Sequence, residues 1–463
     1  MEEIKYHKRL LGNEHNSSTA NPLSISKISV EQLFGHYNYN VSNSSLSDIS
    51  KLLLIYGDNG TGKTTILKLF FYLLATRYRS GYKTKIAEIK FKKFSILFHN
   101  GLEVGALREN SSLGSFEYYI SKNGKIINSV IIKTLPDNSV RLESGSEEEK
   151  KYVEVLDYLR NLNITTFFLS DDRKILNSAA SNSNPYDENR ESYYSDSDII
   201  YSKSYEKHIT KKILNEKRIA FESAIDRLFD WIRNKVLLGS RVGEKNSQVI
   251  IVDIIKDYTE MAETESSIKK KETLLKELDD LEIKMPSYVN LGLIDVFDTK
   301  TIRKSLKKAK DSEQIKFLST LVSPFLEGIN AKLNALENVE KKLNLFIRTV
   351  NDYFTNKEIS FTLSKGFLLK QKDGDEINFN WLSSGEKQLL LLLINTITSA
   401  DDATIFIIDE PEISLNVKWQ RRLIKTLLEF SDDKNIQFIL ATHSIELLAA
   451  YKNNISKLVD QNA

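Results

Sequence analysis

The stretch KLLLIYGDNGTGKT, residues 51–64, decides the fold of this chain. It opens with a short apolar run, Lys51 to Tyr56, which is typical of a buried strand. From Thr64 to Tyr78 the apolar residues recur at helical spacing, which predicts an amphipathic helix. The loop between strand and helix has the spacing G-x-x-x-x-G-K-[ST], and in this context that spacing indicates a phosphate-binding loop in an α/β fold.

The chemistry of phosphate binding explains the residue types in this loop. Backbone N–H groups must approach phosphate oxygens closely, and glycine permits this because it has no side chain to clash. We expect Lys63 to reach the β- and γ-phosphates of ATP, and the Thr64 hydroxyl to bind Mg²⁺. The positive end of the following helix adds to anion binding. The candidate ATP-binding residues of the loop are Gly57, Asp58, Asn59, Gly60, Thr61, Gly62, Lys63, Thr64 and Thr65.

The run TIFIIDE, Thr404–Glu410, supplies the second half of the expected site. Four consecutive apolar residues predict a buried strand, and its end presents two carboxylates. We expect Asp409 to hold Mg²⁺ together with Thr64, and Glu410 to polarise the attacking water. Two adjacent acids at a strand end also fit an ordinary solvated turn. Their pairing with a phosphate-binding loop instead favours a Walker B motif, the strand whose terminal acids, here Asp409 and Glu410, serve the metal ion and the attacking water.

Two further motifs follow the same logic. WLSSGEKQL, Trp381–Leu389, precedes a strongly apolar helix whose N-terminus can bind an anion. Its candidate residues are Ser383, Ser384, Gly385 and Glu386. His443 lies in ATHS, directly after a predicted strand, Gln437–Leu440. The catalytic candidates are therefore Glu410, Lys63 and His443, and the metal-binding candidates are Thr64 and Asp409.

The motifs GDNGTGKT, LSSGEKQ, IFIIDEPE and THS occur in the order of an ABC-type ATPase head, and the chain resembles the SMC, RecF and OLD branch of that family. The resemblance implies an α/β fold, an ABC-type P-loop ATPase head split by a helical, coiled-coil-like insertion. It also implies a homo-oligomer, a dimer or multiple of dimers, with two ATP molecules sandwiched between paired heads. Ser383 and Gly385 would then contact the γ-phosphate bound by the other protomer, and His443 would sense it.

Two departures from the family pattern stand out. The family carries a glutamine after its first strands, yet no glutamine lies between Gln32 and Gln248. Asp171 or Asp172, in LSDDRK, is our suggested replacement. The motif LSSGEKQ stands where the family has its signature motif, and it has Ser384 where that signature usually has glycine. Both departures bear on the rate of hydrolysis more than on ATP binding.

The remaining pattern predicts strands before and after a long helical middle. We expect the hairpin of that middle region to turn near Pro286 to Asp298 and to pair as an antiparallel coiled coil, the alternative being an ordinary helical subdomain. The expected helices are 205–236, 249–285 and 301–354, and the expected strands include 23–33, 86–99, 116–121, 125–133, 165–169 and 359–370. The expected domains are a flexible N-terminus (1–22), two parts of the head (23–200 and 356–463) and the insertion (201–355).

Composition excludes several classes of protein. The chain has 463 residues, with 65 Lys and Arg against 63 Asp and Glu, and this near-zero balance argues against a surface that is basic throughout. The absence of cysteine excludes disulfides, thiolate zinc sites and a cysteine nucleophile. No apolar run is long enough to span a bilayer and no signal peptide is evident, so we expect a cytoplasmic protein without a membrane partner.

Only 20 residues follow His443, which is too few for a nuclease domain. A stand-alone ATPase of this branch resembles the ATPase subunits of bacterial antiphage defence systems, first those of Septu and second those of PARIS. The resemblance implies a sensor and scaffold that controls a separate effector nuclease, of HNH type or TOPRIM type.

Two rival hypotheses stay open. A RecF-like or SMC-like ATPase of DNA repair would bind DNA, with the basic runs Lys269–Lys271 and Lys304–Lys310 on the phosphates. A purely structural coiled-coil protein would keep only a vestigial nucleotide site.

Overall fold

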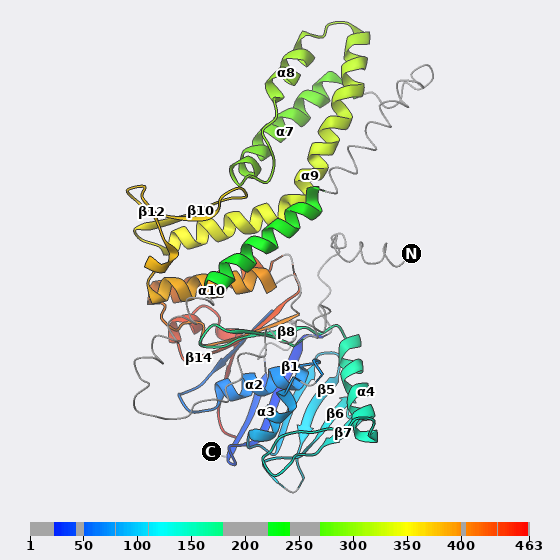
Figure 1. Cartoon of the computed structure of the whole chain (residues 1–463), viewed down its shortest axis with the longest axis vertical. Helices are drawn as coiled ribbons and strands as arrows, with labels where there is room; N and C mark the ends of the chain where they lie inside the picture. Colours follow the sequence, from blue (N-terminus) through cyan, green and yellow to red (C-terminus); the bar gives the residue numbers. More distant parts are fainter. Residues whose placement is uncertain are drawn as a thin grey trace. The chain divides into compact units, whose positions relative to one another are not determined.

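The computed structural model describes residues 23–42, 51–78, 80–109, 111–178, 221–240, 269–399, 404–432 and 434–461. The described residues fall into two compact units (Figure 1). The first lies within Met1–Ile199, Ser399–Ile424 and Ser431–Ala463, and the second within Ile200–Thr398 and Lys425–Phe430. The predicted N-terminal segment 1–22, the predicted surface loop beyond Ser178 and the helical predictions over 205–220 and 249–268 lie outside the described residues.

A mainly parallel sheet of six strands forms one layer of the first unit. Across the sheet the strands are β15 (Ile455–Lys457), β3 (Leu52–Tyr56), β14 (Gln437–Thr442), β13 (Ile405–Asp409), β8 (Thr166–Leu169) and β9 (Ile175–Asn177). All neighbours pair in parallel except β9, which runs antiparallel to β8. Every residue of β13 and β14 is buried, which explains why these strands are almost continuously apolar in sequence.

The register of this sheet brings the sequence motifs to one edge. Tyr56 of β3 pairs with Thr442 of β14, and Ala441 pairs with Asp409 of β13. The carboxyl ends of neighbouring parallel strands therefore lie side by side, and the loops that leave them share that edge. Ligands of open α/β sheets bind outside this edge, so the topology favours a site there.

A second, antiparallel sheet forms the other layer of the first unit. Its order is β2 (Tyr37–Ser42), β1 (Ile25–Leu33), β4 (Lys93–Phe98), β5 (Leu102–Leu107), β6 (Phe116–Lys122) and β7 (Lys125–Ile132). These elements confirm the predicted strands that begin near residues 23, 116 and 125.

Helix α2 (Lys63–Leu74) lies between the two sheets (Figure 1). It contacts β8, β13 and β14 of the parallel sheet and β5 of the antiparallel sheet. Its fully buried residues are Ile66, Leu67, Leu69, Phe70, Phe71, Leu73 and Leu74. The helix is thus apolar on more than the single face that we predicted, because both of its sides are covered.

The predicted strand over 86–99 is wrong in its first part. Helix α3 (Tyr82–Glu88) occupies residues 82–88, and the strand β4 begins only at Lys93. Gly81 begins this helix with φ of 75°, a left-handed conformation that suits glycine. Helix α4 (Glu147–Asn161) was not predicted, although the Ser146 side chain accepts a hydrogen bond from the Glu149 N–H in an N-cap.

The second unit is mainly helical. Its helices are residues 221–240, α7 (Lys271–Asn290), α8 (Thr299–Lys308), α9 (Ser312–Tyr353) and α10 (Ser384–Ser399). A small antiparallel sheet accompanies them, with β10 (Lys357–Thr362), β11 (Gly366–Gln371), β12 (Glu376–Ile377) and the short helix η3 (Phe379–Trp381). The remaining elements among the described residues are α11 (Val417–Phe430), α12 (Ile445–Leu448) and η4 (Lys452–Asn454).

Helices α7 and α9 pack against each other, and each has buried residues at three- and four-residue spacing. The buried positions are Leu274, Leu278 and Leu281 of α7, and Leu333, Leu336, Val339, Leu343, Phe346 and Val350 of α9. The turn between α7 and α8 lies within the predicted range Pro286 to Asp298, although α7 continues to Asn290, beyond the predicted helix end at residue 285. The predicted helix 301–354 is wrong as a single helix, because it is broken between α8 and α9. Coiled-coil pairing of these helices stays a prediction.

The α/β P-loop fold, split in sequence by a helical insertion, is confirmed. Residues of the first unit flank those of the second along the chain. Of the helices that the structure describes, none combines the length and apolarity needed to cross a membrane.

Candidate active site

The glycine-rich loop connects β3 to α2 at the carboxyl edge of the parallel sheet. Gly60 and Gly62 adopt left-handed conformations, with φ of 83° and 89°. A Cβ on Gly62 would lie 2.7 Å from Leu33 Cδ2, so the backbone there leaves no room for a side chain. Gly62 also precedes α2 without any side-chain cap, which leaves the first amides of the helix for a bound anion.

Lys63 folds back over its own loop. Its Nζ donates to the carbonyl oxygens of Gly57, at 2.8 Å, and Asp58, at 3.1 Å. The side chain is 5% exposed, although its ammonium forms no ion pair among the described residues. These two carbonyls hold the ammonium within the loop that we expect to bind the triphosphate. The rest of the loop, from Asp58 to Gly60, is exposed.

Asp409 ends β13 and is 1% exposed. Both of its carboxylate oxygens are buried without a hydrogen bond in the described part of the chain. Burial raises its pKa to about 6; the nearby Thr64 hydroxyl opposes the rise, and the charges of Asp171 and Glu410 add to it. A buried, unpartnered carboxylate beside a hydroxyl fits a divalent cation, because hard cations take oxygen ligands and would offset the cost of burial. Thr64 and Asp409 are thus suited to hold Mg²⁺.

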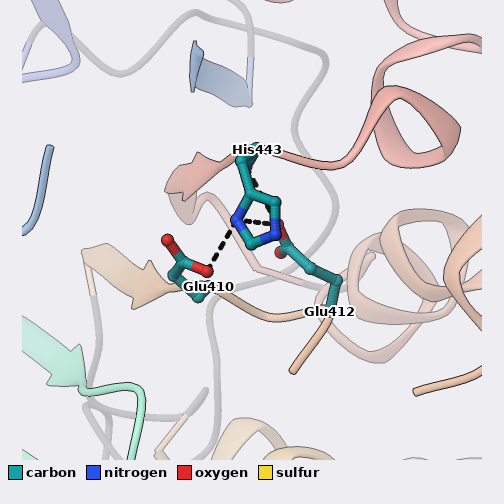
Figure 2. A group of neighbouring side chains, drawn as sticks. All are labelled: Glu410, Glu412 and His443. Carbon is teal, nitrogen blue, oxygen red and sulfur yellow. Dashed lines mark hydrogen bonds and ion pairs between the residues drawn. The ribbon is translucent and has the colours of Figure 1, made fainter. Parts of the chain in front are cut away.

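Glu410 and His443 leave neighbouring strands and meet at the sheet edge. His443 Nδ1 lies 2.8 Å from Glu410 Oε2 and 3.4 Å from Glu412 Oε1. Figure 2 shows the imidazole between the two carboxylates. The His443 side chain is 48% exposed, whereas that of Glu412 is only 4% exposed. The imidazole is therefore about half exposed to a ligand, and its Nδ1 is held by the two carboxylates.

Glu410, Glu412 and His443 are close enough to hold a metal ion, but hydrogen bonds argue against this use of Glu412. Its Oε1 already accepts from the Thr442 hydroxyl and from the backbone N–H groups of His443, at 3.0 Å, and Ser444, at 3.2 Å. Three donors that point at one oxygen would repel a cation there. We therefore assign Glu412 to fixing the backbone after β14.

The two suggested replacements for the missing glutamine differ in their surroundings. The Asp171 charge acts on Asp409 and helps to raise its pKa, so the two carboxylates lie near each other. Asp172 instead accepts hydrogen bonds from Ser170 and Lys174 within its own turn. The structure therefore favours Asp171 of the two.

The signature residues lie in the second unit, at the N-terminus of α10. The Ser383 N–H donates to Glu386 Oε2 at 2.7 Å, and the Glu386 N–H donates to Ser383 Oγ at 3.3 Å. This reciprocal pair is a capping box. Although burial acts to raise the pKa of Glu386, hydrogen bonds from Lys357 and Ser383 lower it. Ser384 and Gly385 begin the helix beside this cap, where backbone N–H groups have no acceptor within the helix.

Arg173 and Glu412 are not among the site residues predicted from the sequence. Both are 4% exposed, which is unusual for charged side chains. Arg173 follows β8 in the predicted LSDDRK run, and Glu412 is the third acid of the DEPE run. Charged residues directly after buried strands were the available signal, but their partners come from distant parts of the chain.

Comparisons with known proteins indicate the family of the chain. A family model described as "AAA domain, putative AbiEii toxin, Type IV TA system" matches residues 52–449. The chain is also similar to "Retron Ec83 probable ATPase" of Escherichia coli, with 28% identity over 163 residues, 32% of this chain. The match spans 29% of the length of that relative.

Solved structures of Smc heads resemble the chain at low similarity. A Pyrococcus furiosus Smc head with an extended coiled coil, bound to the C-terminal domain of ScpA, has a TM-score of 0.37 and 14% identity, over 94% of each chain. An SmcHead bound to the C-winged helix domain of ScpA has a TM-score of 0.36 and 13% identity, over 94% of this chain and 96% of that one.

Proposed function

Because the chain belongs to the family described as "AAA domain, putative AbiEii toxin, Type IV TA system", we propose that it binds ATP and Mg²⁺ at the carboxyl edge of its parallel sheet and hydrolyses ATP slowly. The observation that carries this proposal is the buried carboxylate of Asp409, whose two oxygens lack a hydrogen bond among the described residues. Such a carboxylate is costly unless a cation neutralises it.

Each residue of the site has a distinct role in this proposal. The loop Gly57–Thr65 binds the triphosphate through its amides, with Lys63 turning from the loop carbonyls to the β- and γ-phosphates. Thr64 and Asp409 hold Mg²⁺, which neutralises charge on the phosphates when it is bound. Glu410 orients and polarises the attacking water, and the exposed side of His443 contacts the γ-phosphate.

We further propose that ATP binding pairs two copies of the chain, with Ser383 and Gly385 of one copy facing the nucleotide of the other. In this view the protein is the sensor and scaffold of an antiphage system, like the ATPases of Septu or PARIS, and controls a nuclease of HNH or TOPRIM type in a separate chain. The similarity to a retron ATPase supports a defence role. Co-purification with the product of the neighbouring gene would test the effector.

A DNA-repair ATPase is the second candidate, and the exposed lysines of α8 favour it. Lys304, Lys307 and Lys308 are exposed, and no ion pair to them is found among the described residues. The other basic run is engaged within its own unit: Lys269 pairs with Glu277 and Glu327. Lys271 donates to two carbonyl oxygens at the end of α8. Lys269 and Lys271 are therefore engaged within the second unit, and the run Lys304–Lys310 is the more available of the two to bind DNA phosphates.

Turnover of ATP measured with and without double-stranded DNA, at low and high salt, separates the candidates. The sensor hypothesis predicts turnover that DNA leaves unchanged, and the repair hypothesis predicts stimulation that falls steeply with salt. Lys63→Ala should abolish ATP binding, whereas Lys85→Ala, on the exposed surface of α3, should not. Wild-type protein that binds no ATP would refute both hypotheses and favour a vestigial site.

A further inference from the structure

The turn after β13 has a conformation that its residues do not favour. Glu410 adopts φ of 46°, in the left-handed region that residues other than glycine rarely occupy. Its N–H donates to the carbonyl oxygen of Ala441 at 2.9 Å. Backbone strain of this kind persists only where surrounding groups fix it. The position of the Glu410 carboxylate therefore depends on what holds this turn.

Arg173 supplies that hold. Its guanidinium donates to three consecutive carbonyl oxygens of the turn: Asp409 at 3.3 Å, Glu410 at 3.1 Å and Pro411 at 3.0 Å. A guanidinium is planar and carries five donors in a fixed fork, so it can bind several carbonyls at once. Arg173 itself has φ of 64°, in the turn that follows β8. Two adjacent loops of the sheet edge are thereby joined.

Burial excludes direct contact between Arg173 and a nucleotide. The residue is 4% exposed, and the donors that the structure pairs all go to backbone carbonyls. An arginine that stabilises a phosphate must present its guanidinium to the ligand. Arg173 presents its guanidinium to the backbone of the Walker B turn instead.

Glu412 completes the arrangement from the other side. Burial lowers the pKa of the Arg173 guanidinium to about 10. Among the nearby acids that act to raise this pKa, Glu412 has the largest effect. Its Oε1 holds the backbone N–H groups of His443 and Ser444. Arg173 Nε and Glu412 Oε2 are both buried without a hydrogen bond in the described part of the chain. The buried charges Arg173 and Glu412 thus fix the loops that carry Glu410 and His443, respectively.

We propose that Arg173 is a positioning residue for ATP hydrolysis, which fixes the Walker B turn so that the Glu410 carboxylate faces His443 and the attacking water. The inference rests on the proposed ATPase function. It requires that Arg173 acts on the chemical step and leaves ATP affinity nearly unchanged, because the phosphate-binding loop makes no hydrogen bond to Arg173.

The test compares Arg173→Lys and Arg173→Ala with wild type in ATP affinity, kcat and Tm. Lysine keeps the buried charge but cannot span three carbonyls, so we expect kcat to fall about 10-fold, and about 100-fold for alanine. The dissociation constant for ATP should change by less than about 3-fold in either variant. Lys174→Ala is the matched control: Lys174 is the next residue, is exposed and pairs with Asp172.

A double-mutant cycle with Glu410→Gln distinguishes positioning from general damage to the fold. If Arg173 acts through Glu410, Arg173→Lys should lower the residual turnover of Glu410→Gln by less than about 2-fold. An additive loss in the double variant would overturn the role, as would equal losses of ATP affinity and kcat. If Arg173→Ala does not fold, Arg173→Lys carries the test alone.

The proposed function and this inference fail in different ways. Wild-type protein that does not turn over Mg²⁺-ATP would overturn the ATPase function, and the positioning role with it. Wild-type turnover that Arg173→Lys leaves unchanged would overturn only the positioning role.

Discussion

His443 Nδ1 lies 2.8 Å from Glu410 Oε2, so the expected γ-phosphate sensor and the expected catalytic carboxylate contact each other directly. The Glu410 side chain is 18% exposed and that of His443 is 48% exposed. A γ-phosphate that draws the imidazole toward itself would therefore release the Glu410 carboxylate to the attacking water. Nucleotide sensing and activation of the water are coupled by one contact in this arrangement.

Glu410→Gln should trap ATP without hydrolysing it. The amide keeps the size of the side chain but cannot accept a proton, so we expect kcat to fall by about 100-fold or more while ATP affinity is kept. If two heads enclose the nucleotide, this variant should double its mass in Mg²⁺-ATP, as measured by light scattering. Glu446→Gln is a suitable control, because Glu446 forms a surface pair with Arg421. A variant that stays monomeric with ATP bound would contradict the sandwich.

Asp409→Asn should stabilise the protein and abolish Mg²⁺-dependent turnover. Burial raises the pKa of Asp409 from 3.8 to about 6, so between these pH values the folded state holds a proton that the unfolded chain has lost. Stability therefore falls as the pH rises through this window. At pH 7.5 the variant should gain up to about 3 kcal/mol in the free energy of unfolding without Mg²⁺.

Urea unfolding of both proteins at pH 4 and pH 7.5 measures this effect. The difference in free energy of unfolding between the two proteins should nearly vanish at pH 4. At this pH Asp409 is largely protonated in the folded state and about half protonated in the unfolded chain, so its pKa shift costs the folded state little stability. Adding Mg²⁺ and ATP should stabilise wild type more than Asp409→Asn, because the variant keeps the phosphate-binding loop but lacks a carboxylate ligand for Mg²⁺. A variant less stable than wild type at pH 7.5 would contradict the assignment of a strained, buried charge.

Gly62→Ala should be more harmful than Gly60→Ala, although both glycines have positive φ. Left-handed backbone costs an alanine roughly 1–2 kcal/mol at either position. At Gly62 the new Cβ would also lie 2.7 Å from Leu33 Cδ2, whereas at Gly60 no atom lies within 4 Å. We expect the two free energies of unfolding to differ by at least about 1 kcal/mol. Equal values would mean that Leu33 can move away freely.

The parts of the fold that sequence could predict are those encoded by local pattern. The strand–loop–helix of residues 51–74 follows from a continuous apolar run, three glycines and a helical period, and the structure confirms it. The predicted strand near Ile86 is wrong because α3 is only seven residues long. A helical period over so few residues cannot be distinguished from the alternation of apolar and polar residues in a strand. Short elements are decided by tertiary contacts instead.

The parts of the site that sequence could not predict depend on strand order. Arg173 reaches the Walker B turn because β8 pairs with β13, although more than 200 residues separate them in the chain. Glu412 reaches the loop after β14 because β13 and β14 are neighbours. Strands that pair across such long sequence separations leave no local pattern in the sequence. A charged residue that they bury can therefore be recognised only when the strand order of the sheet is known.

The capping box of the signature predicts different effects for its two serines. Ser383 Oγ accepts from the Glu386 N–H, and Lys357 Nζ lies 2.8 Å from Glu386 Oε2. Ser383→Ala removes the N-cap acceptor and should lower the free energy of unfolding by about 1 kcal/mol. Ser384→Ala leaves the cap intact and places a good helix former in the first turn, so its stability should change little.

Function should separate the same two variants. Both should keep wild-type ATP affinity, because the loop Gly57–Thr65 makes the expected contacts with the bound triphosphate. Ser383→Ala should lose ATP-dependent pairing in the Glu410→Gln background, since it removes both the hydroxyl and the cap that orient the helix N-terminus toward an anion. Light scattering of each double variant in Mg²⁺-ATP measures this pairing. If Ser383→Ala pairs as well as Ser384→Ala, the capping box only stabilises α10, and the signature does not bind nucleotide through Ser383.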